Sequence, residues 1–219
     1  MSKILVIIMY ICLVLVLSNF AQAEFNDDFD GKLSPLWEPV IGIWELQDGK
    51  YNGKGVGQLP GFSLLPFEVA DGMEIEVRAM DTGKGVFNNS LIVFSYVNES
   101  EIYFAGSAIL RGVWLIVSTD HGGRVAMTRW QELAQFEEVL QSNVWYSMKV
   151  EIDKATVRLI VDGKLEVEYT FHPELPKGRI GLGVSGADSL FDDFQVRGVD
   201  AFMISPKKLL ATTWAKLKS

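Results

Sequence analysis

The chain has 219 residues, of which 48% are hydrophobic, and it carries a formal net charge of −8 at pH 7. An acidic protein is a poor partner for nucleic acid, because the negatively charged phosphate backbone repels it. We therefore expect no nucleic-acid binding. The length is sufficient to bury one sizeable hydrophobic core, which favours a single main domain.

Residues 1–23 have the three parts of a secretory signal peptide. Lys3 supplies the positive start, an apolar run extends from Ile4 to Leu17, and Ala21-Gln22-Ala23 fits a small-residue cleavage site. This run is shorter than the roughly 20 apolar residues of a membrane-spanning helix, so we expect cleavage and no membrane span. The sequence predicts a secreted, periplasmic or cell-surface protein, with an uncleaved N-terminal anchor as the alternative.

The single cysteine, Cys12, lies inside this leader. The chain that remains after cleavage has no thiol and forms no disulfide. An exported domain without disulfides is held together by its core alone, or by its core and a metal ion.

Residues 24–200 consist of short segments with strand composition, separated by turn dipeptides such as Asp48-Gly49. Strict alternation of apolar and polar residues is typical of strands that bury one face. The expected strands are Met73–Met80, Ser90–Val97, Val113–Ser118, Val144–Ile152, Arg179–Val184 and Phe191–Arg197, with a hairpin of Thr156–Val161 and Leu165–Phe171 around the primed turn Asp162-Gly163. This spacing predicts an all-β, antiparallel, two-sheet sandwich.

Two similar strings stand at the ends of this domain, Phe25-Asn26-Asp27-Asp28-Phe29 and Phe191-Asp192-Asp193-Phe194. Their likeness predicts that the first and last strands of the sandwich lie together. One segment between them is ambiguous. Trp130 to Gln141 has apolar residues at helical spacing and could form a short helix that crosses the sandwich, but a strand pair with an ordinary connecting loop is slightly favoured.

Residues 201–219 differ from the rest of the chain in composition. Ser205-Pro206 is a typical helix start, and Leu210, Trp214 and Leu217 follow at helical spacing among several lysines. We expect a short, basic, amphipathic C-terminal tail. It either docks on its own domain or meets an anionic surface or partner.

The order of several motifs resembles the concanavalin A-like lectin/glucanase superfamily, and within it the laminin G-like and 3-keto-disaccharide-hydrolase-like jelly rolls. The motifs are Phe25–Gly31, Asn143–Val150, Val161-Asp162-Gly163, Gly178–Leu182 and Phe191–Val196. The resemblance covers about residues 25–198. It implies a jelly roll of two antiparallel sheets, one of them concave, and in relatives the concave sheet commonly binds or cleaves glycans.

Aspartates near both chain ends form a candidate cation site. If the terminal strands pair, Asp28, Asp30 and Asp193 are the expected ligands of a structural Ca²⁺, a cation that takes about 6–8 oxygen ligands. The resemblance also implies calcium near these ends. Asp192 and Asp193 cannot both contribute unless a bulge interrupts the strand, because successive residues point to opposite faces. The alternative is that these aspartates face water or stabilise turns.

Catalytic acids are the next candidates. Glu74 and Glu76 lie on one face of a predicted strand, and retaining glycosidases use two carboxyl groups about 5 Å apart. Laminarinase-type relatives carry the pattern E-x-D-x-x-E, whereas this chain has Glu76 at the middle acid and Ala79 at the last. We therefore interpret the pair as a solvent-facing acidic strand and assign no catalytic residue.

A sugar-binding face combines aromatic rings with planar polar side chains. On or beside the middle strands, Arg78, Tyr103 and Arg111 are the predicted glycan-binding residues. Trp114 and Trp130 are also eligible. Trp114, however, lies in an apolar run and fits the core better.

These observations favour a secreted, noncatalytic carbohydrate-binding or lectin-like adhesion module. The alternatives are a glycoside hydrolase or lyase that acts on disaccharides or polysaccharides, and a structural or partner-binding module without a glycan ligand. Two acids facing each other in the concave groove would indicate the enzyme. Exposed aromatic and arginine side chains without such a pair would indicate the binding module, and a groove of small apolar residues the structural one.

Overall fold

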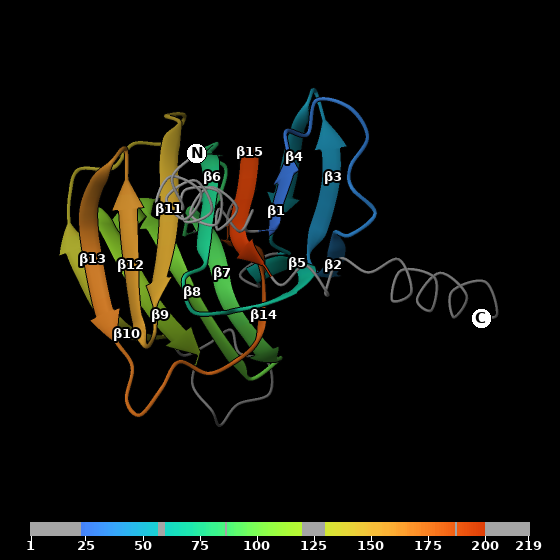
Figure 1. Ribbon diagram of the computed structural model, residues 1–219. Helices are drawn as coiled ribbons and strands as arrows, with labels where there is room; N and C mark the ends of the chain where they lie inside the picture. The colour runs from blue at the N-terminus through green and yellow to red at the C-terminus, as the bar shows by residue number, and fades with distance from the viewer. Residues whose placement is uncertain (1–22, 57–59, 86, 120–129, 187, 200–219) are drawn as a thin grey trace, which may run out of the picture.

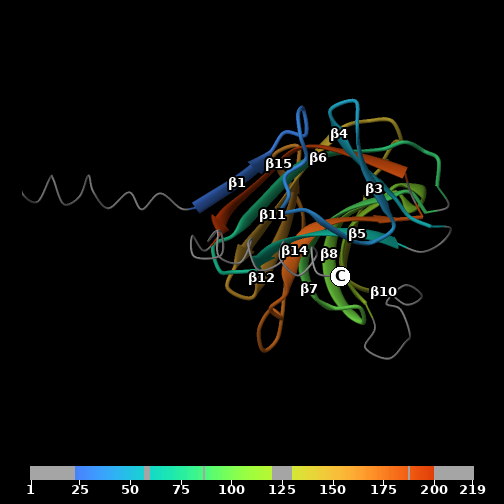
Figure 2. The same ribbon diagram turned by 90° about the vertical axis from the view of Figure 1, so that its right-hand side faces the viewer.

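The structure is a computed structural model that describes residues 23–56, 60–85, 87–119, 130–186 and 188–199. These residues form two antiparallel β-sheets that pack face to face, as the two views in Figures 1 and 2 show. Within these ranges no helix has the length and apolar composition needed to cross a membrane. The predicted signal peptide and basic tail lie outside the described residues.

Sheet A has the strand order β13-β12-β11-β6-β15-β4-β3, and β1 also pairs with β15. It faces the viewer in Figure 1. Its strands are β1 (Ala23–Asp27), β3 (Ile43–Gln47), β4 (Lys50–Lys54), β6 (Glu74–Asp81), β11 (Tyr146–Asp153), β12 (Thr156–Val161), β13 (Lys164–Thr170) and β15 (Asp188–Val199).

Sheet B lies behind sheet A in Figure 1 and has the order β10-β9-β8-β7-β14-β5-β2. A short 3-10 helix, η1 (Ile109–Arg111), follows β8. The strands of sheet B are β2 (Glu38–Ile41), β5 (Pro60–Glu68), β7 (Asn89–Asn98), β8 (Glu101–Ala108), β9 (Val113–Thr119), β10 (Trp130–Glu137) and β14 (Arg179–Ser185).

The main core lies between the two sheets. Ile75 and Val77 of β6 are fully buried there, together with Val150 of β11 and with Ile92 and Phe94 of β7. The alternation predicted for β6 and β11 is confirmed, because their apolar residues share the inner face. Each fully buried aliphatic or phenylalanine side chain contributes about 1.5–3 kcal/mol of hydrophobic stabilisation.

The predicted pairing of the first and last strands is confirmed. β1 runs antiparallel to β15, with Phe25 opposite Val196 and Asp27 opposite Phe194. The two phenylalanine–aspartate strings therefore lie side by side. The Phe25 ring packs against Phe194 at a centroid distance of 6.2 Å, which ties the two ends of the domain together.

Trp130 to Glu137 is a strand, as the slightly favoured alternative predicted. β10 pairs along the whole of β9, from Trp130 opposite Thr119 to Glu137 opposite Val113. The predicted hairpin is also confirmed, because β12 pairs with β13 and the turn residues Asp162 and Gly163 have φ values of 48° and 81°. Positive φ at both central residues is the mark of a primed turn.

The outer face of sheet B, which points away from sheet A, is also apolar. Along β7, Leu91 and Val93 alternate with the core residues Ile92 and Phe94 and so point outward. The buried residues of this second cluster are Phe62, Leu64, Leu91, Val93, Ile102, Phe104, Ala108, Val113, Leu115 and Val117. Sheet B is therefore apolar on both faces.

Aromatic rings show that this outer face is concave. Phe62 of β5 and Phe104 of β8 are separated by β14 and β7, yet their ring centroids lie 6.4 Å apart. Three strand spacings in a flat sheet would place their backbones about 14 Å apart. The sheet thus curves so that side chains on its outer face converge, and Figure 2 shows this curvature.

Candidate functional site

A cavity of about 280 Å³ opens on the concave face of sheet B. It lies where β8 passes into η1 and where β14 ends. Its walls combine aromatic and aliphatic side chains with planar polar ones. The lining residues are Phe87, Asn89, Ala108, Leu110, Arg111, Trp130, Glu132 and Ser185.

Two aromatic rings border this concave cavity. Phe87 is 45% exposed, an unusual state for a phenylalanine, while Trp130 is half-buried. The Trp130 ring packs edge-on against Phe104 at 4.8 Å, which fixes the indole against the floor of the face. Phe87 donates its backbone N–H to the carbonyl oxygen of Gly186 at 3.2 Å. The protein thus presents two positioned rings to solvent beside polar groups.

The polar wall is an Arg111–Glu132 ion pair. The two terminal nitrogens of Arg111 donate to the two carboxylate oxygens of Glu132, one of them at 3.0 Å, and one nitrogen also donates to Gln135 Oε1 at 3.0 Å. Such bidentate pairs hold both side chains in one geometry. The hydrogen bond from Arg111 lowers the pKa of the Glu132 carboxyl below its ordinary value.

Two small polar residues close the opposite wall. Asn89 and Ser185 face each other across β7 and β14, and both are buried. With its amide oriented to satisfy its neighbours, Asn89 donates to the carbonyl oxygens of Phe87 at 2.9 Å and Asn88 at 3.2 Å. This contact also anchors the backbone that carries the Phe87 ring.

A larger cavity, of about 590 Å³, lies at the opposite end of β14. Phe67 is its aromatic lining residue and is almost fully buried, so it presents no ring to a ligand. The rim mixes charges of both signs, including Glu68, Asp71, Lys154 and Lys177. We therefore place the candidate site at the smaller cavity, where exposed rings and a fixed polar pair occur together.

The three predicted glycan-binding residues are not brought together. Arg111 lines the concave cavity, whereas Arg78 lies on β6 in sheet A and stacks over the Trp145 ring at 5.2 Å. Tyr103 is 6% exposed and belongs to the main core, where its ring packs against Phe171 at 5.5 Å. Tyr103 therefore presents no ring face to the concave cavity.

The Tyr103 hydroxyl donates to Glu101 Oε1 at 3.1 Å. Burial, together with this neighbouring carboxylate, raises the pKa of Tyr103 to about 12. Trp114, which the sequence placed in the core, is buried, and its indole N–H donates to Glu138 Oε2 at 2.6 Å.

Phe87 and Glu132 are site residues that the sequence did not single out. Phe87 precedes β7, and no pattern marks a residue before a strand as a ring exposed to solvent. Glu132 lies two residues after Trp130 on β10, so both side chains share one face once the segment is known to be a strand. The two-residue spacing of Trp130 and Glu132 could have predicted that they share a face, but only if the segment had first been assigned as a strand and not as a helix.

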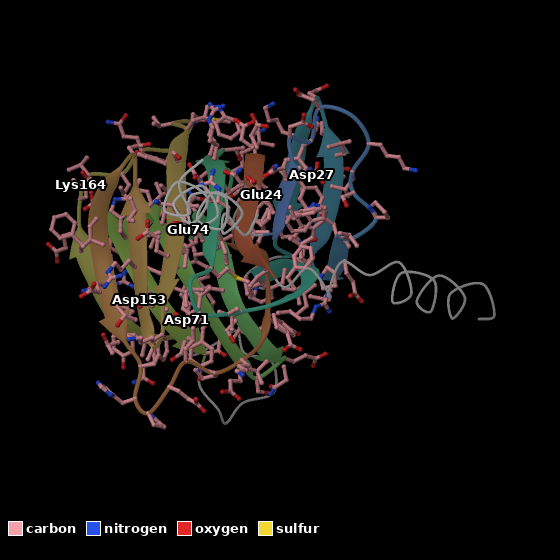
Figure 3. The ribbon with its side chains drawn as sticks, in the orientation of Figure 1. Glu24, Asp27, Asp71, Glu74, Asp153 and Lys164 are labelled. Atoms are coloured by element: carbon pink, nitrogen blue, oxygen red, sulfur yellow. The ribbon has the colours of Figure 1, made fainter. Side chains whose placement is uncertain are left out.

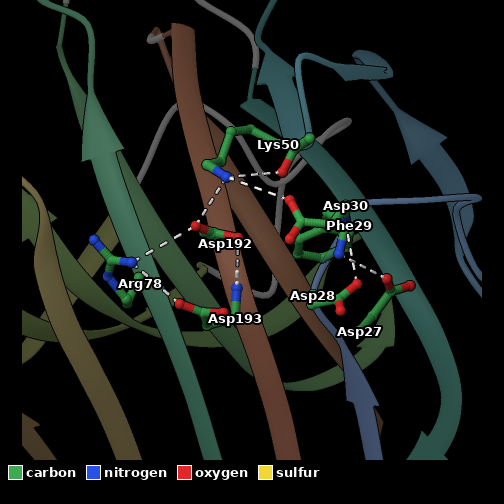
Figure 4. Close-up of polar contacts among 9 residues, drawn as sticks. Asp27, Asp28, Phe29, Asp30, Lys50, Arg78, Asp192 and Asp193 are labelled. Atoms are coloured by element: carbon green, nitrogen blue, oxygen red, sulfur yellow. Dashed lines mark hydrogen bonds and ion pairs between the residues drawn. The ribbon is translucent and has the colours of Figure 1, made fainter.

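Of the predicted calcium ligands, Asp193 lies on β15 of sheet A, and Asp28 and Asp30 lie in the loop that follows β1. β15 has a bulge between Asp192 and Gln195, and Asp193 has a φ of 49°. The bulge lets both aspartates reach one cation, the Arg78 guanidinium, at 3.7 Å and 3.1 Å (Figure 4). The positive charge that these carboxylates face is thus a side chain of the protein itself.

Lys50 supplies a second positive charge beside these aspartates. Its ammonium lies 3.0 Å from Asp192 Oδ2 and 4.0 Å from Asp30 Oδ1 (Figure 4). Asp28 is turned to its own loop, where Oδ1 accepts the Asp30 N–H at 3.2 Å.

Asp27 also serves a turn, accepting hydrogen bonds from the Phe29 and Ser34 backbones and from the Trp37 indole. Among the described residues, no three acidic, histidine or cysteine side chains are grouped to hold a metal ion. In this arrangement Asp28, Asp30 and Asp193 do not fit a shared calcium ion. The calcium ion is therefore an expectation from the sequence alone, and thermal unfolding with and without calcium tests it.

The two acids of the predicted β6 strand lie on the outer face of sheet A, and Figure 3 shows Glu74 there. Glu74 accepts a hydrogen bond from Arg197 at 3.4 Å, and Glu76 one from Ser147 at 3.4 Å. Neither residue lines the concave cavity, whose acidic lining residue among the described residues is Glu132.

Comparisons with solved structures show the same fold. The carbohydrate-binding module CBM66 from Bacillus subtilis superposes with a TM-score of 0.63 at 17% identity, covering 74% of this chain and 95% of that one. A protein of unknown function with a galectin-like fold from Bacillus subtilis gives 0.61 at 14% identity, covering 80% and 95%. The Bacillus licheniformis β-glucanase gives 0.55 at 12% identity, covering 80% and 97%.

A search of curated protein sequences returned no significant match. The likeness to the solved structures shows the fold, an antiparallel two-sheet jelly-roll sandwich. The sequence itself matches one protein family, described as the 3-keto-alpha-glucoside-1,2-lyase-like domain, over residues 24–197. Since the match spans most of the chain, this protein belongs to the family of 3-keto-alpha-glucoside-1,2-lyase-like domains.

Proposed function

We propose that the protein is an exported, noncatalytic carbohydrate-binding module whose ligand enters the cavity on the concave face of sheet B. The observation that carries this proposal is the meeting of two rings, Phe87 and Trp130, with the fixed Arg111–Glu132 pair in one cavity. Rings offer apolar faces to the C–H side of a sugar, and the planar pair offers donors and acceptors to its hydroxyl groups. The resemblance to a carbohydrate-binding module supports the same function.

The chemistry of Glu132 favours binding over hydrolysis. A glycosidase needs a carboxylic acid with a raised pKa and a second carboxylate facing it. Hydrogen bonding to Arg111 lowers the pKa of Glu132, so this carboxyl is a poor proton donor near neutral pH. No second carboxylate appears among the described residues that line the cavity.

The family description favours a second candidate, a lyase acting on 3-keto-glucosides. Such an elimination removes a proton next to a carbonyl group and therefore needs a general base. Among the described residues that line the cavity, Glu132 is the carboxylate that could act as this general base. Its lowered pKa and its double contact with Arg111 make it a weak base. We therefore rank this activity behind binding.

The test is a glycan array with the purified protein, followed by calorimetric titration of the glycans that bind. We expect Phe87→Ala to weaken binding about tenfold or more, since covering one phenylalanine side chain contributes about 1.5–3 kcal/mol. Phe136→Ala is the matched control, because Phe136 is 44% exposed, nearly as much as Phe87, but lies outside the cavity. It should leave binding unchanged.

Absence of binding to every glycan would overturn the proposed function. Equal losses in the two phenylalanine variants would overturn the assignment to this cavity. Turnover of a 3-keto-disaccharide, followed by NMR, would replace binding with the lyase alternative.

A further inference from the structure

Within the proposed function, on which this inference rests, we propose that the site takes one neutral terminal sugar residue of a glycan and not an internal stretch of its chain. Three features of the concave face favour such a ligand: its filling by side chains, its closed end and its charge.

Side chains of the protein fill most of the concave face. Along the groove, Phe62 packs against Phe104 at 6.4 Å and against Tyr96 at 6.1 Å, and Phe104 packs against Trp130 at 4.8 Å. The apolar residues beneath these rings are buried. An extended glycan chain needs a continuous open path across such a face, and these rings occupy it.

Among the described residues of the concave face, the open space lies at the end of the groove. Its volume, about 280 Å³, lies just below the range of about 300–1,000 Å³ that is typical of sites for drug-sized ligands. A single sugar ring with part of its neighbour suits this space better than several rings in a row. The size of the cavity therefore favours entry of one sugar unit over entry of several.

A wall stands at the end of the groove. η1 places Leu110 and Arg111 at the rim, and Gly112 then takes a left-handed conformation with φ of 61°. This turn brings the chain back into β9, so that Leu110, 63% exposed, projects beside the opening. A glycan that continued in both directions would meet this wall on one side and the aromatic filling on the other.

The charge of the cavity favours a neutral ligand. Arg111 and Glu132 compensate each other through two hydrogen bonds, and the remaining polar lining residues, Asn89 and Ser185, are uncharged. A uronic acid would have to compete with Glu132 for the guanidinium, and a cationic sugar would have to compete with Arg111 for the carboxylate. Hydroxyl groups can be accepted without breaking the pair.

The experiment is a calorimetric titration of the protein with linear glucans, galactans, mannans and fructans. Each is used as its methyl monosaccharide and as chains of increasing length, and methyl glucuronide serves as the charged counterpart. For the glycan that binds, we expect one protein bound per chain end at every length, and a dissociation constant that changes less than about threefold from the shortest to the longest chain. The methyl monosaccharide should compete for the same site.

A number of bound proteins that grows with chain length would overturn terminal recognition while leaving glycan binding intact. Preference for the glucuronide would overturn the neutral-ligand part. Lack of binding to these probes and to every glycan of the array would instead overturn the proposed function itself. Two variants that separate the pair extend the test. Glu132→Gln should raise the affinity for the anionic glucuronide relative to the neutral sugar, because the Arg111 charge is no longer compensated. Arg111→Met should lower it, because the Glu132 charge is no longer compensated.

Discussion

The ammonium of Lys50 lies 3.0 Å from Oδ2 of Asp192, a carboxylate that is almost buried in the bulge of β15. The same ammonium donates to the Gly49 carbonyl oxygen at 3.0 Å and lies 4.0 Å from Asp30. One lysine therefore joins the last strand to the loop region near the start of the domain. This is the region in which the sequence predicted a calcium ion.

Removing this lysine should destabilise the fold. We expect Lys50→Met to lower the free energy of unfolding by about 2 kcal/mol, because Asp192 would keep its charge with only Arg78, at 3.7 Å, beside it. Lys54→Met is the control, since Lys54 pairs with the exposed Glu45 at 3.0 Å and such surface pairs contribute about 0–1 kcal/mol. Urea unfolding of both variants measures the difference. Equal effects would show that Lys50 has no special role.

Calcium should add little where Lys50 and Arg78 already meet the aspartates. A ligand that binds only the native state must raise the midpoint of thermal unfolding. Since two cationic side chains already face the carboxylates, we expect the same midpoint in EDTA and in millimolar calcium. A midpoint that rises with calcium would instead support the ion predicted at Asp28, Asp30 and Asp193. The same comparison with Lys50→Met tests whether calcium raises the midpoint once the competing ammonium is removed.

Glycan binding should persist into acid. Arg111 lowers the pKa of Glu132, so the carboxylate keeps its charge below the pH at which an ordinary glutamate is protonated. Affinity should therefore hold down to about pH 4.5, the ordinary glutamate pKa, and fall only below it. Calorimetry across pH checks this, and in Glu132→Gln the acid fall should disappear. A loss of affinity already near pH 6 would contradict the role given to Glu132.

Two buried tyrosines should resist ionisation. Burial raises the pKa of both Tyr51 and Tyr103 to about 12, from an ordinary value near 10. The unfolded chain loses these protons first, so both groups favour folding fully below about pH 10 and lose that effect as the pH rises toward 12. Ultraviolet absorbance during alkaline titration measures the ionisation.

Tyr103→Phe should remove part of the late absorbance change and leave glycan binding unaltered. Its cost in stability should be about 1 kcal/mol, the usual value of one hydrogen bond, here the contact with Glu101. A marked loss of binding in this variant would return Tyr103 to the list of ligand contacts.

Alternation of apolar and polar residues predicted the strands that have a contrast between their two faces. β6 and β11 alternate because one face meets the core and the other meets water. Both faces of sheet B are buried, which removes the alternation there. β7 and β9 were predicted from their β-branched and aromatic composition instead, whereas β8 and β5 contain glycine, serine or proline and were not predicted. The burial of both faces also explains Tyr103. It and Phe104 point to opposite faces of β8, both faces are apolar, and no pattern in the sequence tells which residue meets the core.

The candidate site could be predicted only in part. Arg111 was found because it is a charged residue beside an apolar strand. Its partner Glu132 lies 21 residues further on, and their contact depends on the register of β9 with β10. Such a register is a property of the assembled sheet. The bulge at Asp192 is similar, since it was stated as a condition for both aspartates to act together but not predicted to occur.

The pairing of β1 with β15 has a consequence for how the domain can be presented. Ala23 and Val199 are opposite each other on sheet A, whereas the candidate cavity opens on the outer face of sheet B. The first and last described residues of the domain are thus neighbours on sheet A, whereas the cavity lies on sheet B. Attaching either end to a bead, a sensor chip or a fusion partner leaves the ligand entrance directed away from the support.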